Sequence, residues 1–385
     1  MPLFVNISGT WAEVSAPSIN VNGVYYDLTE MYYKVNGAWM SIWEAVHVIW
    51  NKNTYLVLEG TTASDINKST KSMRKGGSLL FGAGTWNIDE PIRINTSGIS
   101  IIGAPNNMTT LKRSSNHDNN GLLDIRGTST DPLKNIIIRG LVIDGQYKES
   151  KFTGKGIYAE HIVGEFNDNL GIKIEDCTIL NNDICGVEFN HVYNNYVLGN
   201  VFQNNFGNNL SITNSRNINI SKNIIQNSSG QGLSIDNSNH NIITDNTIQN
   251  NFGGIKFNLS SKNTIISNII QNNNGDGLNM TYSNNNSAVS NVVQNNGNGD
   301  GVVLVYADNN SITSNTVQNN GTYGIQIFIG NNNAVVGNTI SLNGVHGVAI
   351  SRMSKNNVLN SNIITTNKIG QLLDSGETAL LYGNI

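Results

Sequence analysis

The sequence predicts an all-β protein: a right-handed parallel β-helix from about residue 77 to residue 385, preceded by a small β-hairpin module. Two internal repeats carry this prediction, one with a step of 14 residues and one with a step of 22–24 residues. Asn, with 68 of the 385 residues, is interleaved with Ile, Val and Leu at fixed spacing, which is typical of turns between short strands. A unit of this length buries its apolar side chains only by stacking on copies of itself, so the longer repeat predicts a solenoid.

The first repeat lies in residues 1–50 and is rich in aromatic side chains. Equivalent positions hold Gly9, Gly23 and Gly37, and the positions two residues later hold Trp11, Tyr25 and Trp39. A Ser-Gly or Asn-Gly pair between β-forming residues supplies the positive φ angles of a tight hairpin turn. We therefore expect β-hairpin repeats in residues 1–50. Residues 51–76 are expected to be a connector with a short helix near Ala63 to Arg74.

The second repeat continues to the C-terminus and places similar residues in columns. One column holds Asn200, Asn223, Asn246, Asn268, Asn291, Asn315, Asn338 and Asn362, with Cys177 at the same place one unit earlier. An apolar column two residues further along runs from Ile179 to Ile364. Each unit is expected to contain three short strands and three turns, so that a parallel sheet closes on itself without covering helices. We expect the Asn column to occupy one turn in left-handed geometry, with amide bonds from one unit to the next.

Composition excludes several classes of partner and cofactor. Only 13% of residues are charged and the net charge is −4, so no nucleic-acid partner is expected. No apolar stretch is long enough to insert into a membrane, and the N-terminus has no basic region followed by an apolar run, so no signal peptide is expected. Two cysteines, the lack of zinc-ligand spacing and the lack of an Asp-rich calcium repeat predict no disulfide framework, no metal and no cofactor.

Two segments resemble known proteins. Gly76 to Trp86 (Gly-Gly-Ser-Leu-Leu-Phe-Gly-Ala-Gly-Thr-Trp) and Ile99 to Pro105 resemble the first rungs of the pectate-lyase-like superfamily, which includes many bacteriophage tailspikes. With the later Asn-rich repeats, this resemblance covers about four-fifths of the chain; it is specific for the fold but not for one activity. The 14-residue units, such as Tyr33 to Trp39, resemble short Gly-x-Trp repeats of phage structural proteins.

The resemblance to tailspikes and tail fibres implies a function and partners. It implies a virion protein, made in the host cytoplasm, that recognises a host cell-surface polysaccharide. The resemblance leaves open whether the protein also has glycan-depolymerase activity. Residues 1–50 would attach it to other tail or baseplate proteins. Many tailspikes are trimers, so the resemblance also implies a homotrimer.

Insertions that break the longer repeat are where function is expected, because loops of a solenoid tolerate variation. They lie at Met108–Asn120, Gln146–Lys155 and Ile162–Asn169. In the alternating strand of each unit, one outward column begins at Tyr158 and Glu188 and a second begins at Glu160 and Asn190. The predicted catalytic residues are Glu160, Glu188 and Asp236. The predicted carbohydrate-binding residues are Tyr147, Phe152, Tyr158, His161, His191 and Lys256, with the two histidines just past the strand, where they also fit ordinary solvated turn residues.

The spacing of the acidic residues leaves the chemistry open. Glycoside hydrolysis uses two carboxylates about 5–5.5 Å apart for retention of configuration and about 6.5–9.5 Å apart for inversion, and rungs about 4.8 Å apart approach both values. Three functions therefore stay open: a glycan-recognising spike, which is a polysaccharide hydrolase or lyase if it is an enzyme; a purely structural virion or baseplate component; and a bacterial β-helix lyase, hydrolase or epimerase.

Overall fold

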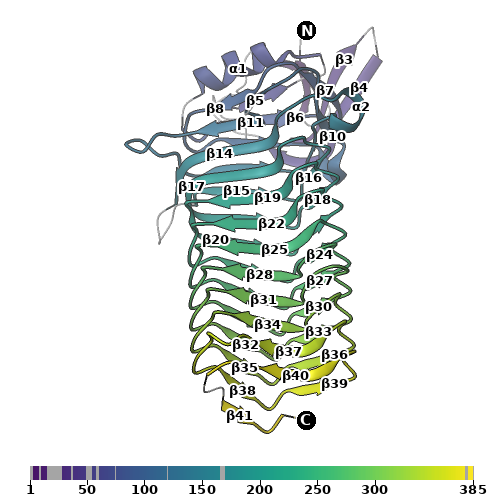
Figure 1. Ribbon diagram of the computed structural model, residues 1–385. Coiled ribbons are helices and arrows are strands. Elements are labelled where there is room, and N and C mark those ends of the chain that lie inside the picture. The colour runs from purple at the N-terminus through teal and green to yellow at the C-terminus, as the bar shows by residue number, and fades with distance from the viewer. Residues whose placement is uncertain are drawn as a thin grey trace.

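The computed structural model shows a long rod of stacked strands with its N-terminal end at the top of Figure 1. It describes residues 3–7, 10–14, 28–35, 38–48, 54–57, 60–73, 75–118, 120–164, 170–377 and 380–384. Within these ranges, no helix is long and apolar enough to cross a membrane.

The N-terminal strands form an antiparallel sheet of their own. They are β1 (Leu3–Ile7), β2 (Thr10–Val14), β3 (Leu28–Val35) and β4 (Ala38–Val48), in the order β2-β1-β3-β4. The register pairs Ile7 with Thr10 and Val35 with Ala38, so each hairpin has two residues between its strands, as the sequence predicts. The middle unit of the 14-residue repeat lies outside the described residues.

The rod consists of three parallel ladders, one strand from each ladder per rung. The first contains β7 (Gly84–Ile88), β10 (Thr109–Arg113), β13 (Leu141–Asp144), β16 (Thr178–Leu180), β18 (Val201–Gln203), β21 (Ile224–Gln226), β24 (Thr247–Gln249), β27 (Ile269–Gln271), β30 (Val292–Gln294), β33 (Thr316–Gln318), β36 (Thr339–Ser341) and β39 (Ile363–Thr365). The second contains β8 (Ile92–Ile94), β11 (Gly121–Arg126), β14 (Lys155–Val163), β17 (Cys185–Leu198), β19 (Asn208–Thr213), β22 (Gln231–Asp236), β25 (Gly253–Asn258), β28 (Leu278–Thr281), β31 (Val302–Val305), β34 (Ile325–Phe328), β37 (His346–Ile350) and β40 (Gly370–Asp374). The third contains β5 (Thr54–Val57), β6 (Ser78–Phe81), β9 (Ser100–Ile102), β12 (Ile136–Arg139), β15 (Ile172–Glu175), the second half of β17, β20 (Arg216–Ser221), β23 (Ile242–Thr244), β26 (Thr264–Ile266), β29 (Ser287–Val289), β32 (Ser311–Thr313), β35 (Ala334–Val336), β38 (Val358–Asn360) and β41 (Leu380–Tyr382).

Helices are few among the described residues and lie near the N-terminal rungs. Helix α1 (Ala63–Ser72) contacts β8 and confirms the predicted short helix. It begins at Thr62, whose hydroxyl accepts a hydrogen bond from the Asp65 amide at 3.1 Å. A short turn, η1 (Pro105–Asn107), precedes β10, and a one-turn helix, α2 (Tyr147–Ser150), lies in the second insertion. Because β10 is a regular strand, most of the predicted insertion at Met108–Asn120 lies after Arg113.

The core is a continuous apolar column inside the rod. Residues that face inward in the second ladder, such as Val187, Leu210 and Leu233, are fully buried and pair in register from rung to rung. The register also confirms both predicted outward columns, since Tyr158 pairs with Glu188 and Glu160 with Asn190. Every later rung up to β34 continues these two columns.

The Asn column forms a buried ladder of hydrogen bonds, as predicted. The Asn246 side-chain oxygen accepts from the backbone N–H of Asn223 at 3.0 Å and from its side-chain amide at 2.9 Å. The Asn246 amide donates to Ile220 O and to Asn268 Oδ1, both at 2.9 Å. Similar ladders of Asn side chains run through the other corners, for example at Asn251.

The predicted backbone geometry of this column is wrong by one residue. The left-handed residue is the one that precedes each ladder Asn, as at Lys222 (φ +57°) and Asp245 (φ +57°). The left-handed residue turns the chain, and the next side chain then points into the rod, where its amide reaches the neighbouring rung. The ladder Asn itself therefore keeps ordinary backbone geometry.

Removal of one ladder amide tests how much this ladder stabilises the rod. We expect Asn246→Ala to lower the free energy of unfolding by about 3 kcal/mol or more, because it leaves a buried N–H and a buried carbonyl without partners. Asn237→Ala, at an exposed left-handed corner, is the matched control and should lower it less, by about 1–2 kcal/mol, the cost of left-handed geometry for Ala. Denaturant unfolding of the purified variants measures both, and equal losses would contradict the assigned role of the ladder.

Candidate functional site

The site lies on the outward face of β11, β14 and β17, where the two outward columns carry charged and aromatic residues on consecutive rungs. The first column holds Asp124, Tyr158 and Glu188, and the second holds Arg126, Glu160 and Asn190. Together with Lys155 these seven residues are called the charged face below. Alternation along each strand points them away from the apolar core, and parallel register brings together residues some 30 positions apart in the sequence.

Tyr158 lies at the centre of the charged face between two cations. The guanidinium carbon of Arg126 is 4.6 Å from the ring centroid, and the Lys155 ammonium is 4.2 Å from it. Arg126 also donates from Nε to Asp124 Oδ1 at 2.6 Å, and Lys155 Nζ lies 3.1 Å from Glu188 Oε1. Cations at this range are attracted by the ring quadrupole, so they hold the ring in place.

Burial changes the chemistry of the Tyr158 phenol. The ring is only 8% exposed, and its desolvation, with the nearby Glu160 carboxylate, raises the pKa of Tyr158 above its ordinary value. The phenol therefore stays protonated at neutral pH. It can act as a hydrogen-bond donor, and it is a poor general base.

The two glutamates are diagonal neighbours. Glu188 lies opposite Tyr158, and Glu160 lies two residues further along the adjacent strand. With rungs about 4.8 Å apart and a rise of about 3.3 Å per residue, their backbone positions are about 8 Å apart. Asn190 donates to Glu160 Oε1 at 2.9 Å, which fixes the orientation of that carboxylate.

A hollow extends the charged face toward the N-terminal rungs. It has a volume of about 350 Å³ and is lined by Arg93, Ile94, Asn95, Asn120, Asp124 and Arg126. Asn120 Oδ1 accepts from Arg126 Nη2 at 2.6 Å, so the hollow and the charged face share one hydrogen-bond network. Amide and guanidinium groups of this kind are suited to a ligand rich in hydroxyl groups.

The structure brings together five of the predicted site residues: Glu160, Glu188, Tyr158, His161 and His191. The two histidine rings stack with centroids 5.0 Å apart and an interplanar angle of 28°. The histidines lie inside the long strands β14 and β17 rather than past a strand end, and each has a left-handed backbone, with φ of +50° and +54°.

The other predicted residues lie apart from this group. Asp236 is two rungs beyond Glu188 and accepts a hydrogen bond from Asn258 at 2.8 Å, and Lys256 is exposed on the next rung. Tyr147, in α2, packs on Phe206 with ring centroids 4.9 Å apart. Phe152 lies in the loop that joins α2 to β14, and its side chain is half-buried.

Sequence reasoning missed Asp124, Arg126 and Lys155. The first two continue the outward columns by one rung toward the N-terminus, so extending the repeat across the insertion would have found them. Lys155 had no such signal, because only its long side chain carries it to Tyr158 and Glu188. Its signal in the sequence was its place at the end of the predicted insertion Gln146–Lys155.

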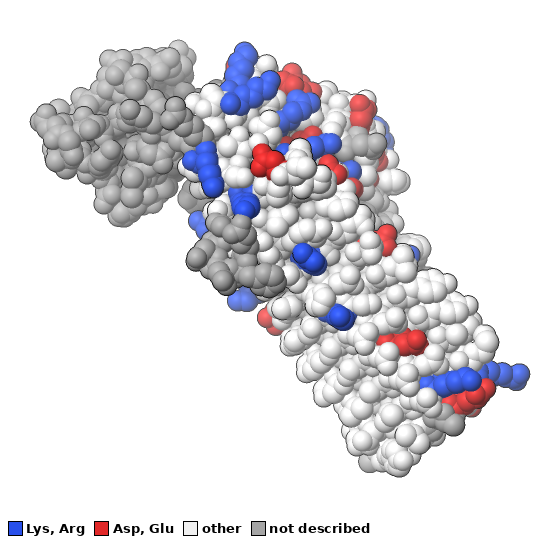
Figure 2. Space-filling model, turned by 90° about the vertical axis from the view of Figure 1, so that its left-hand side faces the viewer, with Lys and Arg blue, Asp and Glu red and all other residues white. Residues whose placement is uncertain are grey.

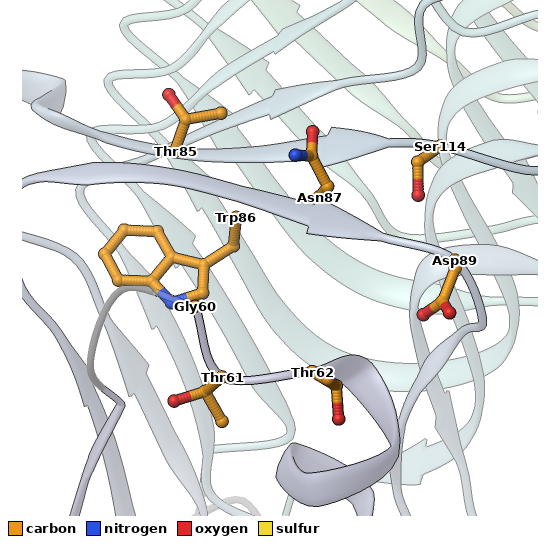
Figure 3. A pocket seen from close by; sticks show the side chains of 8 residues that line it. All are labelled: Gly60, Thr61, Thr62, Thr85, Trp86, Asn87, Asp89 and Ser114. Carbon is orange, nitrogen blue, oxygen red and sulfur yellow. The ribbon is translucent and has the colours of Figure 1, made fainter.

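A second hollow, of about 450 Å³, lies between the start of α1 and β7 (Figure 3). Its lining residues are Gly60, Thr61, Thr62, Thr85, Trp86, Asn87, Asp89 and Ser114. Figure 3 shows short hydroxyl side chains around it, with Asp89 at one side. It contains none of the predicted site residues.

One group of described residues has the composition of a metal site. Glu160, His161 and His191 each offer a ligand atom, and these atoms lie within 4.8 Å of one another. The sequence predicted no metal, because it has no zinc-ligand spacing, and the two histidines, although at equivalent places in adjacent units, also fit solvated turn residues.

Comparison with solved structures gives several matches with the same fold. The A-module of the Azotobacter vinelandii mannuronan C-5 epimerase AlgE4 matches with a TM-score of 0.55 and 16% identity, over 84% of this chain and 91% of that module. The A-module of AlgE6 from the same organism gives a TM-score of 0.55 and 14% identity, over 84% and 94%. The Dettilon tailspike protein gives a TM-score of 0.55 and 14% identity, over 83% of this chain and 68% of the tailspike. At these identities the likeness shows the fold alone.

Comparison with curated protein sequences gave no match. The family described as "right handed beta helix region" matches residues 161–303 and 231–385, which together are more than half of the chain. The protein therefore belongs to the right-handed β-helix family.

Proposed function

We propose that the protein is a bacteriophage spike or fibre that recognises a polysaccharide on the surface of its host through the charged face. The observation that carries this proposal is the uneven distribution of charged side chains along the rod. Figure 2 shows Lys, Arg, Asp and Glu gathered over the rungs near the N-terminal end, with few of them on the lower rungs of the same view. A rod that served only as a spacer between other virion proteins would not need the two ion pairs that surround the nearly buried Tyr158.

The groups of the charged face match those that bind sugars. The Tyr158 ring is the rigid centre of this face, with Arg126 and Lys155 packed on it, and the groups around it donate and accept hydrogen bonds. Arg126 and Lys155 hold the ring with their charges, so little side-chain entropy is lost when a ligand binds. A shallow, polar, aromatic-centred surface of this kind suits a hydroxyl-rich polymer better than an apolar small molecule.

A second contact region lies further along the same edge. The corner residues that follow His161 and His191 in register include Tyr282 and Tyr306, whose rings stack with centroids 5.1 Å apart. These side chains are 51% and 43% exposed. Tyr282 lies four rungs beyond His191, or about 19 Å at about 4.8 Å per rung, a distance that a polymer spans. The Dettilon tailspike protein, which has the same fold, supports a virion role.

Cleavage of the bound polymer is the second candidate function, and the placement of Glu160 and Glu188 favours it. Their backbone positions on adjacent rungs are about 8 Å apart, so both carboxylates can face one glycosidic bond of a bound polymer, as the paired carboxylates of glycoside hydrolases do. Asp236, the third predicted catalytic residue, is about 12 Å from Glu188 by the same geometry. The likeness to mannuronan C-5 epimerase modules keeps a bacterial carbohydrate-active enzyme as the alternative identity.

Attachment and assembly follow from the same proposal. Residues 1–50, with their separate antiparallel sheet, would join the rod to other tail or baseplate proteins. Three copies would associate, as in many tailspikes.

Glycan binding is tested on immobilised capsular polysaccharides and lipopolysaccharides from bacterial strains. We expect Tyr158→Ala to weaken binding by about tenfold or more, since the ring holds Arg126 and Lys155 in place and the loss of contacts worth about 1–2 kcal/mol has this effect. Tyr158→Phe should keep most of the affinity, and Tyr196→Ala, an exposed tyrosine on the third ladder, should keep all of it. If the wild-type protein binds none of these glycans, a purely structural role replaces the proposal.

Cleavage is tested by following the length of a bound polysaccharide over time. We expect Glu160→Gln and Glu188→Gln each to slow chain shortening by about 100-fold or more, the usual effect of losing a general acid or base. Asp236→Asn is the informative comparison, because it should leave the rate within about threefold if the acting pair is Glu160 and Glu188. Unchanged polymer length with the wild-type protein leaves glycan recognition without cleavage.

Deletion of residues 1–50 tests the attachment role. The shortened protein should keep its polysaccharide binding and its β-rich circular dichroism spectrum, but should no longer associate with tail particles in a co-sedimentation assay. Light scattering of the intact protein should give about three times the monomer mass of 41.8 kDa. Co-sedimentation without residues 1–50 would contradict the attachment role.

A further inference from the structure

Glu160, His161 and His191 form a compact group at the edge of the charged face. One carboxylate oxygen and one ring nitrogen from each histidine lie within 4.8 Å of one another. All three side chains are half-buried, so the group is neither sealed in the core nor free in solvent. Two imidazoles and one carboxylate are a frequent ligand set for Zn²⁺ and related ions.

The backbone explains why the two imidazoles meet. His161 and His191 occupy the same left-handed corner on adjacent rungs, because Glu160 pairs with Asn190 and Ile162 with Val192. The side chains at this corner therefore leave the rod in the same direction, one rung apart. Glu160, the residue before His161, reaches the same space from the outward column.

Two further observations point to a ligand at this place. The Nδ1 atom of His191 is buried and has no hydrogen-bond partner in the described part of the chain. A buried polar nitrogen of this kind needs a partner. Glu160 is also held in place, because Asn190 donates to one of its oxygens at 2.9 Å, in the way that outer residues orient the ligands of metal sites.

We propose that Glu160, His161 and His191 bind one divalent transition-metal ion of the Zn²⁺ class. Ligand atoms on a tetrahedral ion are about 3.3 Å apart, given metal–ligand distances of about 2.0–2.1 Å. The three atoms all lie within 4.8 Å of one another, so small side-chain rotations are enough to bring them onto one ion. Nitrogen ligands favour Zn²⁺, Co²⁺, Ni²⁺ or Cu²⁺ over Mg²⁺ and Ca²⁺, which prefer oxygen.

The ion would join two rungs and keep a free position. Its ligands come from β14 and β17, so it crosslinks adjacent strands at the point where the outward columns meet the corner. Three protein ligands leave a fourth position for water or for an oxygen atom of a ligand. The site shares Glu160 with the charged face, but its test does not depend on the proposed glycan recognition, because ion binding is measured on the protein alone.

The test is calorimetric titration of the full-length protein with Zn²⁺ after dialysis against a chelator. We expect one ion per chain and a dissociation constant in the micromolar range or below. The variants are His161→Asn and His191→Asn, because Asn occupies this corner on the next two rungs at Asn214 and Asn237 and is compatible with the fold. Each should weaken Zn²⁺ binding by about 100-fold or more, and Asn190→Ala by about tenfold.

His240→Asn is the matched control, since His240 is an exposed histidine at another left-handed corner. It should leave Zn²⁺ affinity unchanged, and Mg²⁺ and Ca²⁺ should not compete. Absorption bands of bound Co²⁺ that disappear in the His161 and His191 variants would report direct coordination. The proposal is overturned if Zn²⁺ does not bind stoichiometrically, or if binding survives in both variants, or if the His240 variant loses it equally.

Discussion

The structure depends on hydrogen bonds between buried side-chain amides and the backbone at the corners of the rod. A parallel ladder pairs its strands, but each corner leaves backbone groups that no strand can pair. The column represented by Asn223, Asn246 and Asn268 satisfies them, because each amide bonds both to its neighbour and to a carbonyl of the rung before. An unpaired group of this kind costs about 1–3 kcal/mol, and it would recur on every rung. The ladder thus makes a helix-free parallel solenoid possible.

This constraint also sets the register of the surface. Once Asn and the inward apolar residues fix each rung against the next, the outward residues must stack in columns as well. Tyr158 and Glu188 meet for this reason, although 30 positions separate them in the sequence. A site on such a rod needs no loop to assemble it, since a few substitutions in neighbouring units place chosen side chains side by side.

The fold could be predicted because every unit repeats the same pattern of buried and exposed residues. The outward columns followed from counting alone, and the register confirms them. The left-handed position could not be read in the same way, because the column of Asn residues marks a corner without showing which residue turns the chain. Lys222 and Asp245 turn it on two rungs and Ser267, Ser290 and Ser314 on later rungs, so no single residue type marks this position along the whole column. The site was predicted only in part for a related reason. The repeat in the sequence assigns a residue such as Asp236 or Lys256 to its rung, but the contacts of Lys155 depend on the length and direction of its side chain.

The left-handed corner after the second outward column shows where this rod can vary. Left-handed geometry suits Asn and is strained by about 1–2 kcal/mol for larger side chains. The corner holds His161 and His191, then Asn214 and Asn237, and then, as the column continues, it holds Leu259, Tyr282, Tyr306 and Ile329, all with φ between +45° and +57°. Leucine, tyrosine and isoleucine gain nothing from this backbone, and the core does not require them, because Leu259 and both tyrosines are exposed. Strain retained at exposed positions of an otherwise uniform ladder is an indication of function. The edge that begins at the histidine pair and ends at the stacked tyrosines therefore carries large side chains that neither the backbone geometry nor the core requires.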